Sequence, residues 1–139
     1  MIDSAEILKA KVLIVDDQAA NVRLLEQTLG GAGFVSVTSS LDPRAVCELH
    51  RTNHYDLILL DLQMPVMDGF EVMDGLREIE KDGSLPVIVV TAQPDQRLRA
   101  LRAGARDFFT KPIDLAEVLA RVHRMLEVSL LAKATGSVD

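Results

Sequence analysis

Short runs of apolar residues recur along the chain and constrain its fold more than any other feature. Four of them occupy residues 12–15, 34–37, 57–60 and 87–90, and a weaker fifth run follows at 107–110. The first, third and fourth runs are continuous rather than alternating, which is typical of parallel strands covered by helices on both faces. Ser36 interrupts the second run and polar residues follow it, so we expect this strand at an edge of the sheet.

Helical patterns occupy the segments between these runs. The stretch Gly30-Gly31-Ala-Gly33 ends the first helix. Asp42 followed by Pro43 supplies a capping side chain and a first-turn proline for the second. Asp114 and Glu117 resemble a capping box before the last helix. The other helical faces are formed by Val22, Leu25 and Leu29; by Phe70, Met73 and Leu76; by Leu98 and Leu101; and by Leu115, Val118, Leu119, Val122, Met125 and Leu126.

Strand and helix alternate five times, which predicts an α/β fold. We expect a (βα)5 flavodoxin-like, doubly wound parallel sheet with strand order 2-1-3-4-5. A length of 139 residues suits one domain. We expect an N-terminal extension at 1–10, the domain at 11–128, and a C-terminal tail or the start of a linker at 129–139.

Charge and composition exclude several classes of protein. A net charge of −6 argues against direct nucleic-acid binding, because phosphate binding requires a basic surface. The single cysteine excludes an internal disulfide framework. The N-terminus lacks a basic start followed by an apolar stretch, and the longest apolar runs are too short to span a bilayer. We therefore expect a cytoplasmic protein without a signal peptide or a membrane association.

Polar residues follow four of the predicted strands where each strand ends. Asp16 and Asp17 follow the first strand, Asp61 the third, Thr91 the fourth and Lys111 the fifth. The carboxyl ends of parallel strands meet at one edge of the sheet, so we expect these side chains to converge. Three carboxylates so close repel one another unless a hard divalent cation such as Mg²⁺ lies between them. A lysine and a hydroxyl beside them suit a phosphoryl group.

Taken together, these motifs are similar to a known family. Over about residues 10–128 the chain resembles the receiver domain of two-component response regulators. The motifs that carry the resemblance are Val15-Asp16-Asp17, Leu60-Asp61-Leu-Gln-Met-Pro65, Met67-Asp68-Gly69, Val90-Thr91-Ala92, Gly104-Ala105 and Phe108-Phe-Thr-Lys111-Pro112.

The resemblance implies a phosphoacceptor and a metal site. Asp61 would accept the phosphoryl group, and Mg²⁺ would be held by Asp16, Asp17, Asp61 and the backbone carbonyl of Gln63. Asp17 is expected to bind the metal directly and Asp16 at least partly through water. Gln63 and Gln93 stand where the family tunes dephosphorylation, and neither is a carboxylate.

The resemblance also implies a conformational switch. Lys111 would contact the phosphoryl oxygens, and its peptide bond with Pro112 is expected to be cis. Thr91 and Phe108 would form the switch pair, which transmits the change to the surface of the fourth helix, the fifth strand and the last helix. Phe108 lacks the hydroxyl of the tyrosine commonly found at its position, so its inward state depends on packing alone.

The expected function is a phosphorylation-operated signalling switch. A sensor histidine kinase or a phosphotransfer protein would donate the phosphoryl group from a phosphohistidine to Asp61. The chain would catalyse only its own phosphorylation and dephosphorylation. A homodimer through the fourth helix, the fifth strand and the last helix, and a C-terminal output domain, are further partners that the resemblance leaves open.

Two other functional classes remain as alternatives at this point. Haloacid-dehalogenase phosphatases also use an aspartate nucleophile after a strand, with a hydroxyl residue, a lysine and Mg²⁺. They carry a second aspartate two positions after the nucleophile, where this chain has Gln63. The other alternative is a receiver-like adaptor that binds partners without phosphate, and the intact set of acidic, hydroxyl and lysine residues weighs against it.

Other residue patterns have simpler interpretations. His50 and His54 are spaced i, i+4 and could ligate a metal, but no third ligand is evident, so we expect them to border the surface. Cys47 is interpreted as a small apolar residue. Four arginines make the fourth helix basic, as either a solvated face or a partner surface: Arg97, Arg99, Arg102 and Arg106.

Overall fold

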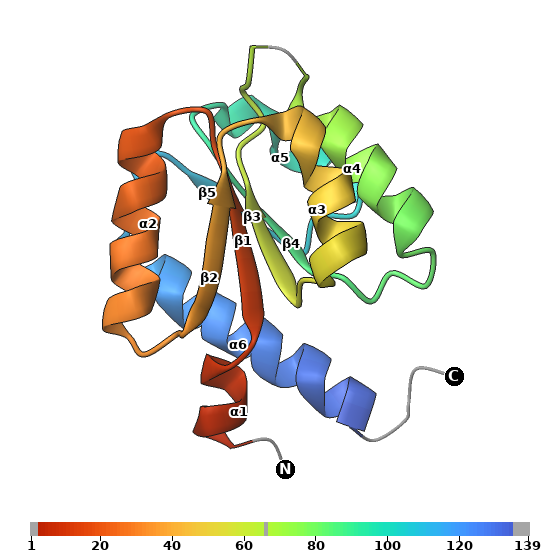
Figure 1. The fold of residues 1–139 in the computed structure, drawn as a ribbon. Coiled ribbons are helices and arrows are strands. Elements are labelled where there is room, and N and C mark those ends of the chain that lie inside the picture. The colour runs from red at the N-terminus through yellow and green to blue at the C-terminus, as the bar shows by residue number, and fades with distance from the viewer. Residues whose placement is uncertain (1–2, 66, 135–139) are drawn as a thin grey trace.

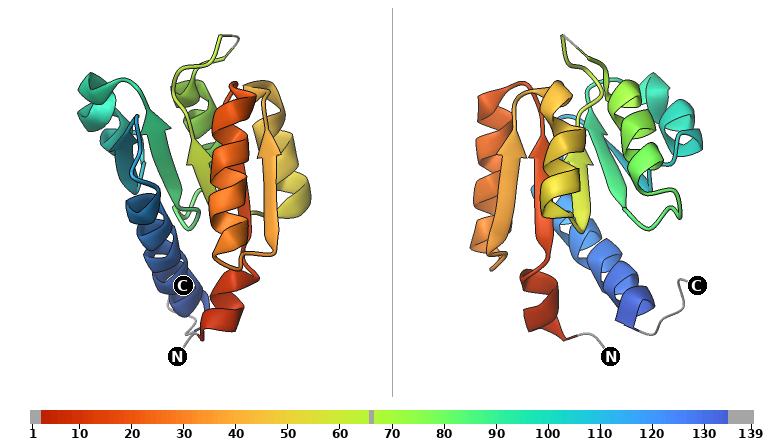
Figure 2. Two further views of the ribbon diagram at one scale, coloured as in Figure 1. Left: turned by 90° about the vertical axis from the view of Figure 1, so that its left-hand side faces the viewer. Right: turned by 45° about the vertical axis from the view of Figure 1, so that its right-hand side comes forward.

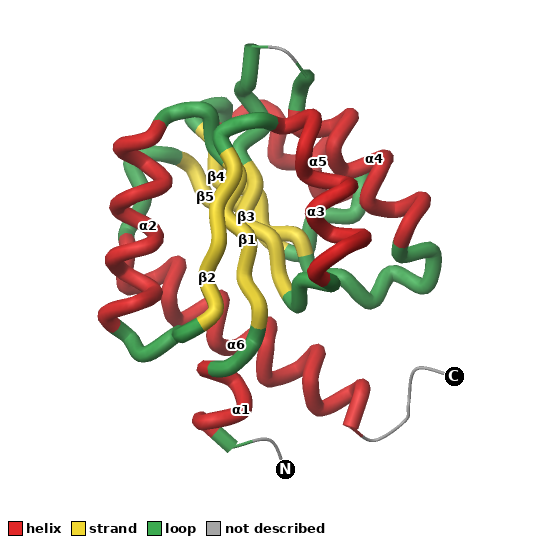
Figure 3. The backbone as a smooth tube through the Cα atoms, viewed as in Figure 1, coloured by secondary structure: helices red, strands yellow, loops and turns green. Residues whose placement is uncertain are grey.

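A five-stranded parallel sheet runs through the centre of the molecule (Figures 1 and 3). The computed structural model describes residues 3–65 and 67–134. The strands are β1 (Lys11–Val15), β2 (Ser36–Ser40), β3 (Leu57–Leu60), β4 (Val87–Thr91) and β5 (Asp107–Thr110). Their order is β2-β1-β3-β4-β5, and every neighbouring pair is parallel. The predicted fold class and strand order are confirmed.

Helices cover both faces of this sheet. The α-helices are α1 (Ser4–Leu8), α2 (Ala19–Gly31), α3 (Val46–Asn53), α4 (Gly69–Ile79), α5 (Arg97–Arg102) and α6 (Leu115–Ala134). Two 3₁₀ turns, η1 (Pro43–Ala45) and η2 (Pro94–Gln96), lead into α3 and α5. Helices α2 and α6 lie on one face, and α3, α4 and α5 lie on the other (Figure 1). None of the described helices combines the length and the apolar character that a membrane span requires.

Successive residues of the central strands point to opposite faces and build two cores. In β1, Val12 and Ile14 pack with residues of α2 and α6, whereas Leu13 and Val15 pack with residues of α3, α4 and α5. A strand alternates its side chains between faces, so two covered faces require a continuous apolar run. The uninterrupted runs in the sequence therefore have a direct structural cause.

The second strand lies further along the chain than its apolar run predicts. The predicted span was 34–37, and the observed strand is Ser36–Ser40. Phe34 is buried, but its backbone N–H bonds to the carbonyl of Leu29 at the end of α2, so it belongs to the helix–strand turn. Because β2 is an edge strand with one neighbour, polar residues can continue its pairing with β1. The predicted edge position is confirmed.

Both ends of the described chain pack against the domain. Ile7 of α1 and Ala10 are buried in the core with α6, although they lie in the predicted N-terminal extension. Figure 2 shows α1 beneath the sheet and beside α6. Helix α6 continues through residue 128, the predicted end of the domain, to Ala134, and Leu130 packs against the core. Residues 1, 2 and 135–139 of the predicted extension and tail lie outside the described residues.

Helix α5, which corresponds to the fourth helix predicted from the sequence, does not bury the leucines that predicted it. Leu98 and Leu101 are the apolar residues that predict this helix, but they are 59% and 37% exposed. The buried residue is Ala100, whose small side chain lies in the core with α4. Because the helix is only six residues long and packs through a small side chain, its two leucines remain on the outer surface.

His50 is fully buried, so its predicted surface position is wrong. Its Nδ1 accepts a hydrogen bond from the Tyr55 N–H at 3.1 Å, which places the ring proton on Nε2. Nε2 then donates to Glu80 Oε1 at 2.8 Å. Both ring nitrogens are thus used by protein groups, which rules out the alternative of a metal ligand. His54 is exposed as expected and ends α3 in a left-handed conformation with φ of 53°.

The start of α4 is fixed by a capping box and a close backbone approach. The Asp68 carboxylate accepts from the Glu71 N–H at 2.9 Å, and Glu71 accepts from the Asp68 N–H. A Cβ added to Gly69 would lie 2.7 Å from the Leu62 Cα and 2.9 Å from the Asp61 carbonyl oxygen. The first turn of α4 therefore rests directly on the backbone that follows β3.

We predict that Gly69→Ala destabilises the fold by about 2 kcal/mol or more, because backbone atoms cannot give way as side chains do. The matched control is Gly30→Ala in α2, where an added Cβ meets nothing within 4 Å. That variant should gain about 0.5–1 kcal/mol, since alanine favours a helix over glycine. Urea unfolding followed by circular dichroism measures both, and equal effects of the two variants would contradict this account of the α4 contact.

Candidate functional site

Two aspartates from strands distant in sequence meet at the carboxyl edge of the sheet. Strands β1 and β3 are neighbours, with Val15 paired to Leu60, so Asp16 and Asp61 follow at adjacent strand ends. They are only 3% and 5% exposed, whereas Asp17 beside them is not buried. One carboxylate oxygen from each of the three residues lies within 4.8 Å of the others. The predicted convergence of the acidic residues is confirmed.

Lys111 bridges the two buried carboxylates. Its ammonium Nζ donates to Asp16 Oδ2 at 2.8 Å and to Asp61 Oδ2 at 3.0 Å. Burial disfavours the charged amine, but the hydrogen bonds to both aspartates outweigh it and raise the pKa of Lys111 above its usual value. The backbone N–H of Lys111 donates to the Thr91 carbonyl at 2.8 Å, and the peptide bond to Pro112 is cis. The lysine thus remains charged at neutral pH and is attached to the end of β4.

Backbone N–H groups hold the other carboxylate oxygens. The Gln18 N–H donates to Asp16 Oδ1 at 2.9 Å, and the Gln63 N–H donates to Asp61 Oδ1 at 3.1 Å. Each aspartate therefore bonds to the backbone two residues ahead, as such side chains do in tight turns. These two donors are not among the sequence-based predictions, although an aspartate at the start of a loop is a signal for this turn. The Gln63 carbonyl as a metal ligand stays a prediction.

Thr91 is the last residue of β4, and Phe108 is the second residue of the neighbouring strand β5, where it pairs with Val89. Thr91 is fully buried, and its Oγ1 has no hydrogen-bond partner within the described part of the chain. An unsatisfied buried hydroxyl costs about 1–3 kcal/mol, so such a group requires a structural or functional reason. Phe108 is buried in the core shared with α3, α4 and α5.

A cation–π contact and a small pocket lie near the residues that follow β3, and neither is among the sequence-based predictions. The Arg99 guanidinium of α5 stacks on the Phe70 ring of α4, 3.8 Å from its centroid. Gln63 and Gln93 line the same pocket of about 280 Å³. The two glutamines flank one opening, although they lie 30 positions apart in the sequence.

The donor set at this edge fits a hard divalent cation. The three clustered side chains are all carboxylates, which are the ligands that Mg²⁺ prefers. Asp17 is accessible to solvent, unlike Asp16 and Asp61, so a bound ion there can keep water in its remaining positions. Lys111 already neutralises part of the charge on Asp16 and Asp61, so a cation must compete with it.

Comparison with known proteins agrees with this geometry. The family model described as "Response regulator receiver domain" matches residues 12–123. The chain belongs to this family. Receiver domains of two-component response regulators are phosphorylation-based signalling switches, and this receiver domain has the predicted residues at the expected edge.

Curated relatives of this receiver domain are longer proteins. It is 38% identical over 126 residues to the response regulator PleD of Caulobacter vibrioides, covering 89% of this chain and 28% of PleD. It is 37% identical over 116 residues to the transcriptional regulatory protein PrrA of Mycobacterium tuberculosis, covering 84% of this chain and 49% of PrrA. The receiver domain therefore spans less than half the length of either relative.

Solved structures share the fold of this receiver domain. The signal receiver domain of a putative Luxo repressor protein from Vibrio parahaemolyticus aligns with a TM-score of 0.84 and 25% identity, covering 91% of this chain and 97% of that one. The CheX–CheY–BeF3–Mg complex from Borrelia burgdorferi aligns with a TM-score of 0.74 and 32% identity, covering 81% and 86% of the two chains.

We predict that Mg²⁺ binds at the acidic edge and that two substitutions shift its affinity in opposite directions. Asp17→Asn should weaken binding by about tenfold or more, because it removes an anionic ligand. Lys111→Met should strengthen binding, because the competing ammonium is lost. Glu78→Gln removes an exposed charge on α4 and serves as the control. NMR titration measures all three, and an unchanged affinity in Asp17→Asn would reject this ligand assignment.

Proposed function

We propose that Asp61 accepts a phosphoryl group from the phosphohistidine of a sensor histidine kinase or a phosphotransfer protein, in a Mg²⁺-dependent reaction. The observation that carries this proposal is the Lys111 ammonium held between the buried carboxylates of Asp16 and Asp61. Phosphoryl transfer needs positioning and charge stabilisation more than covalent assistance. A fixed carboxylate with a cation beside it meets both requirements.

The reaction forms a bond between an Asp61 oxygen and phosphorus and breaks the bond between phosphorus and the histidine nitrogen. The electron pair leaves with the imidazole. Lys111 then stabilises negative charge on the phosphoryl oxygens. Mg²⁺, when held by Asp16, Asp17, Asp61 and the Gln63 carbonyl, supplies further positive charge. The Gln63 N–H keeps the carboxylate oriented throughout.

The output depends on Thr91 and Phe108. Phosphoryl oxygens on Asp61 give the unpartnered Thr91 hydroxyl an acceptor, so phosphorylation favours a packing in which Thr91 approaches the site. The space it leaves allows Phe108 to repack, and the surface formed by α5, β5 and α6 changes with it. Because Phe108 has no tyrosine hydroxyl, its own inward state is held by packing alone.

The same surface is the proposed site of further partners. Leu98 and Leu101 of α5 are exposed, which suits a homodimer contact through α5, β5 and α6. An output domain joined to this receiver domain is supported by the greater length of PleD and PrrA. A phosphatase is disfavoured, because Gln63 stands where the second aspartate of that class is required.

We predict that acetyl phosphate with Mg²⁺ labels the protein once and that Asp61→Asn abolishes the label. An amide is a far poorer nucleophile than a carboxylate, and it loses the charge that binds the metal. Intact-mass spectrometry detects the added phosphoryl group, and Asp114→Asn at the exposed start of α6 is the control. Continuous turnover of acetyl phosphate would favour the phosphatase, and undiminished labelling of Asp61→Asn would move the acceptor elsewhere.

We predict that Thr91→Val stabilises the unphosphorylated protein by about 1 kcal/mol, because it removes an unsatisfied buried hydroxyl at almost constant volume. The variant should also bind beryllofluoride without the chemical-shift changes of wild type at Phe108 and along α5. Thr110→Val is the control, since Thr110 pairs with Thr91 across the sheet but is exposed. Wild-type shifts in Thr91→Val would show that the hydroxyl does not couple the site to Phe108.

A further inference from the structure

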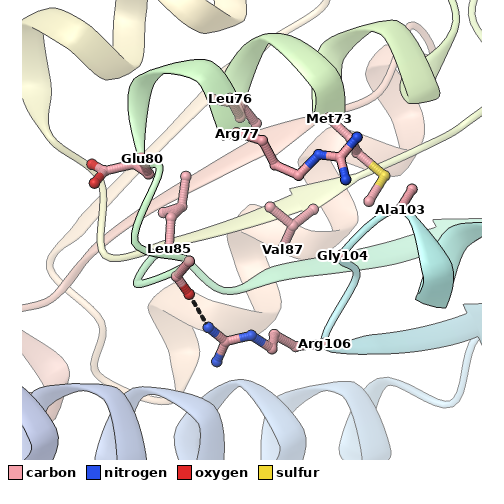
Figure 4. Close-up of a pocket in the computed structure, with 10 residues that line it drawn as sticks. Met73, Leu76, Arg77, Glu80, Leu85, Val87, Ala103, Gly104 and Arg106 are labelled. Atoms are coloured by element: carbon pink, nitrogen blue, oxygen red, sulfur yellow. Dashed lines mark hydrogen bonds between the residues drawn. The ribbon is translucent and has the colours of Figure 1, made fainter. Parts of the chain in front are cut away.

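A pocket of about 230 Å³ lies between α4, the start of β4 and the turn that joins α5 to β5 (Figure 4). Val87 in its floor is the first residue of β4, whereas Thr91 at the phosphorylation site is the last, so the pocket is at the opposite end of the sheet. Its walls are apolar and come from Met73, Leu76, Leu85 and Ala103. Nothing in the proposed phosphoryl transfer uses this pocket.

Two arginines from different elements border the apolar floor. Arg77 comes from α4 and extends over the pocket near Met73 and Ala103, and Arg106 lies at the other side, before β5 (Figure 4). Arg106 donates to the Gly83 carbonyl, and no carboxylate of the described residues is paired with it. Arg77 pairs with Asp74, but both side chains are more than half exposed and such pairs contribute little. Both guanidinium groups can therefore bind an anionic partner.

The acidic residue in the lining does not oppose such a partner. Glu80 borders the pocket, but its side chain points away from it (Figure 4). Its Oε1 accepts from His50 Nε2 at 2.8 Å. This partly buried interaction directs the carboxylate toward α3, so the charged side chains that border the pocket and are left for a partner are the two arginines.

Helix α5 and the turn that follows it carry further positive charge, whereas α4 and the turn after it carry charges of both signs. Residues 97–106 contain four arginines and no acidic residue, although the whole chain carries a net charge of −6. A concentrated charge opposite in sign to that of the whole molecule steers partners of complementary charge toward one face. On this protein that partner is acidic.

We propose that this pocket docks an acidic protein segment that inserts one large apolar side chain between α4 and β4 and places carboxylates on Arg77 and Arg106. A cavity of about 150 Å³ can hold benzene, so 230 Å³ accommodates one aromatic or branched aliphatic side chain. A single anchor in an apolar pocket with charged groups at the rim is a common arrangement of interface hot spots. Asp61 does not line the pocket, so docking is proposed to be independent of phosphate on Asp61.

The probe is a fluorescent peptide with one central phenylalanine flanked by glutamates, titrated into the full chain by anisotropy and NMR. We expect saturable binding, with chemical-shift changes at Leu85, Val87 and Ala103. The same peptide with serine in place of phenylalanine should bind at least about tenfold more weakly, because the anchor is lost. Absence of binding, equal binding of the serine peptide, or equal competition by a short RNA would overturn the proposal.

Matched variants assign the binding to the pocket. Arg77→Gln and Arg106→Gln should each weaken binding about five- to tenfold by removing one charge. Arg124→Gln removes an exposed arginine on α6 and should leave binding unchanged. Ala103→Leu fills the pocket from the end of α5 and should abolish binding, while circular dichroism and urea unfolding confirm that each variant folds. Equal loss in Arg124→Gln, or full binding by folded Ala103→Leu, would overturn the proposal.

The phosphoacceptor variant separates this proposal from the proposed function. Asp61→Asn should bind the peptide as wild type does, because Asp61 lies at the other end of the sheet. Failure of phosphoryl labelling with intact peptide binding would reject only the proposed function. Loss of peptide binding in Asp61→Asn would reject the proposal that the pocket binds its partner independently of the acidic edge.

Discussion

The Lys111 ammonium between Asp16 and Asp61 is the interaction on which the site depends. Two carboxylates that are almost completely buried repel each other, and the desolvation of each is costly without a positive charge nearby. The lysine offsets both effects with direct hydrogen bonds. The three residues come from the ends of β1, β3 and β5, so the ion pairs form only when the sheet has its observed strand order.

The rest of the fold keeps these groups in place. Apolar cores on both faces of the sheet hold the central strands, and the turns after β1 and β3 direct backbone N–H groups at the aspartates. Gly69 allows the start of α4 to rest on the backbone next to Asp61. Thr91 is the exception, since its buried hydroxyl has no hydrogen-bond partner among the residues that the structure describes. A rigid frame around the unsatisfied Thr91 hydroxyl is suited to a switch, because a new acceptor at Asp61 changes the balance between two packings.

Helix α5 and the turn after it lie between the phosphorylation site and the arginine-bordered pocket. It is six residues long, it buries Ala100, and Arg99 stacks on Phe70 of α4 near the phosphorylation site. The turn that follows it forms part of the arginine-bordered pocket at the opposite end of the sheet. An element with so little buried surface can shift at low cost in free energy. Both the proposed output surface and the proposed docking pocket therefore involve the same short helix.

Local sequence patterns determined the strands, their order and the residues of the acidic edge. The continuous runs before Asp61 and Thr91 required a sheet covered on both faces, and parallel strands bring their carboxyl ends together whatever the details of packing. Tertiary structure alone decided features that depend on contacts between distant residues. His50 is buried because Glu80, 30 positions away, accepts its hydrogen bond, and Ile7 is buried because α6 packs over it. Likewise, the exposure of Leu98 and the meeting of Arg77 with Arg106 around one pocket follow from how α4 and α5 pack, which no periodicity within either helix records.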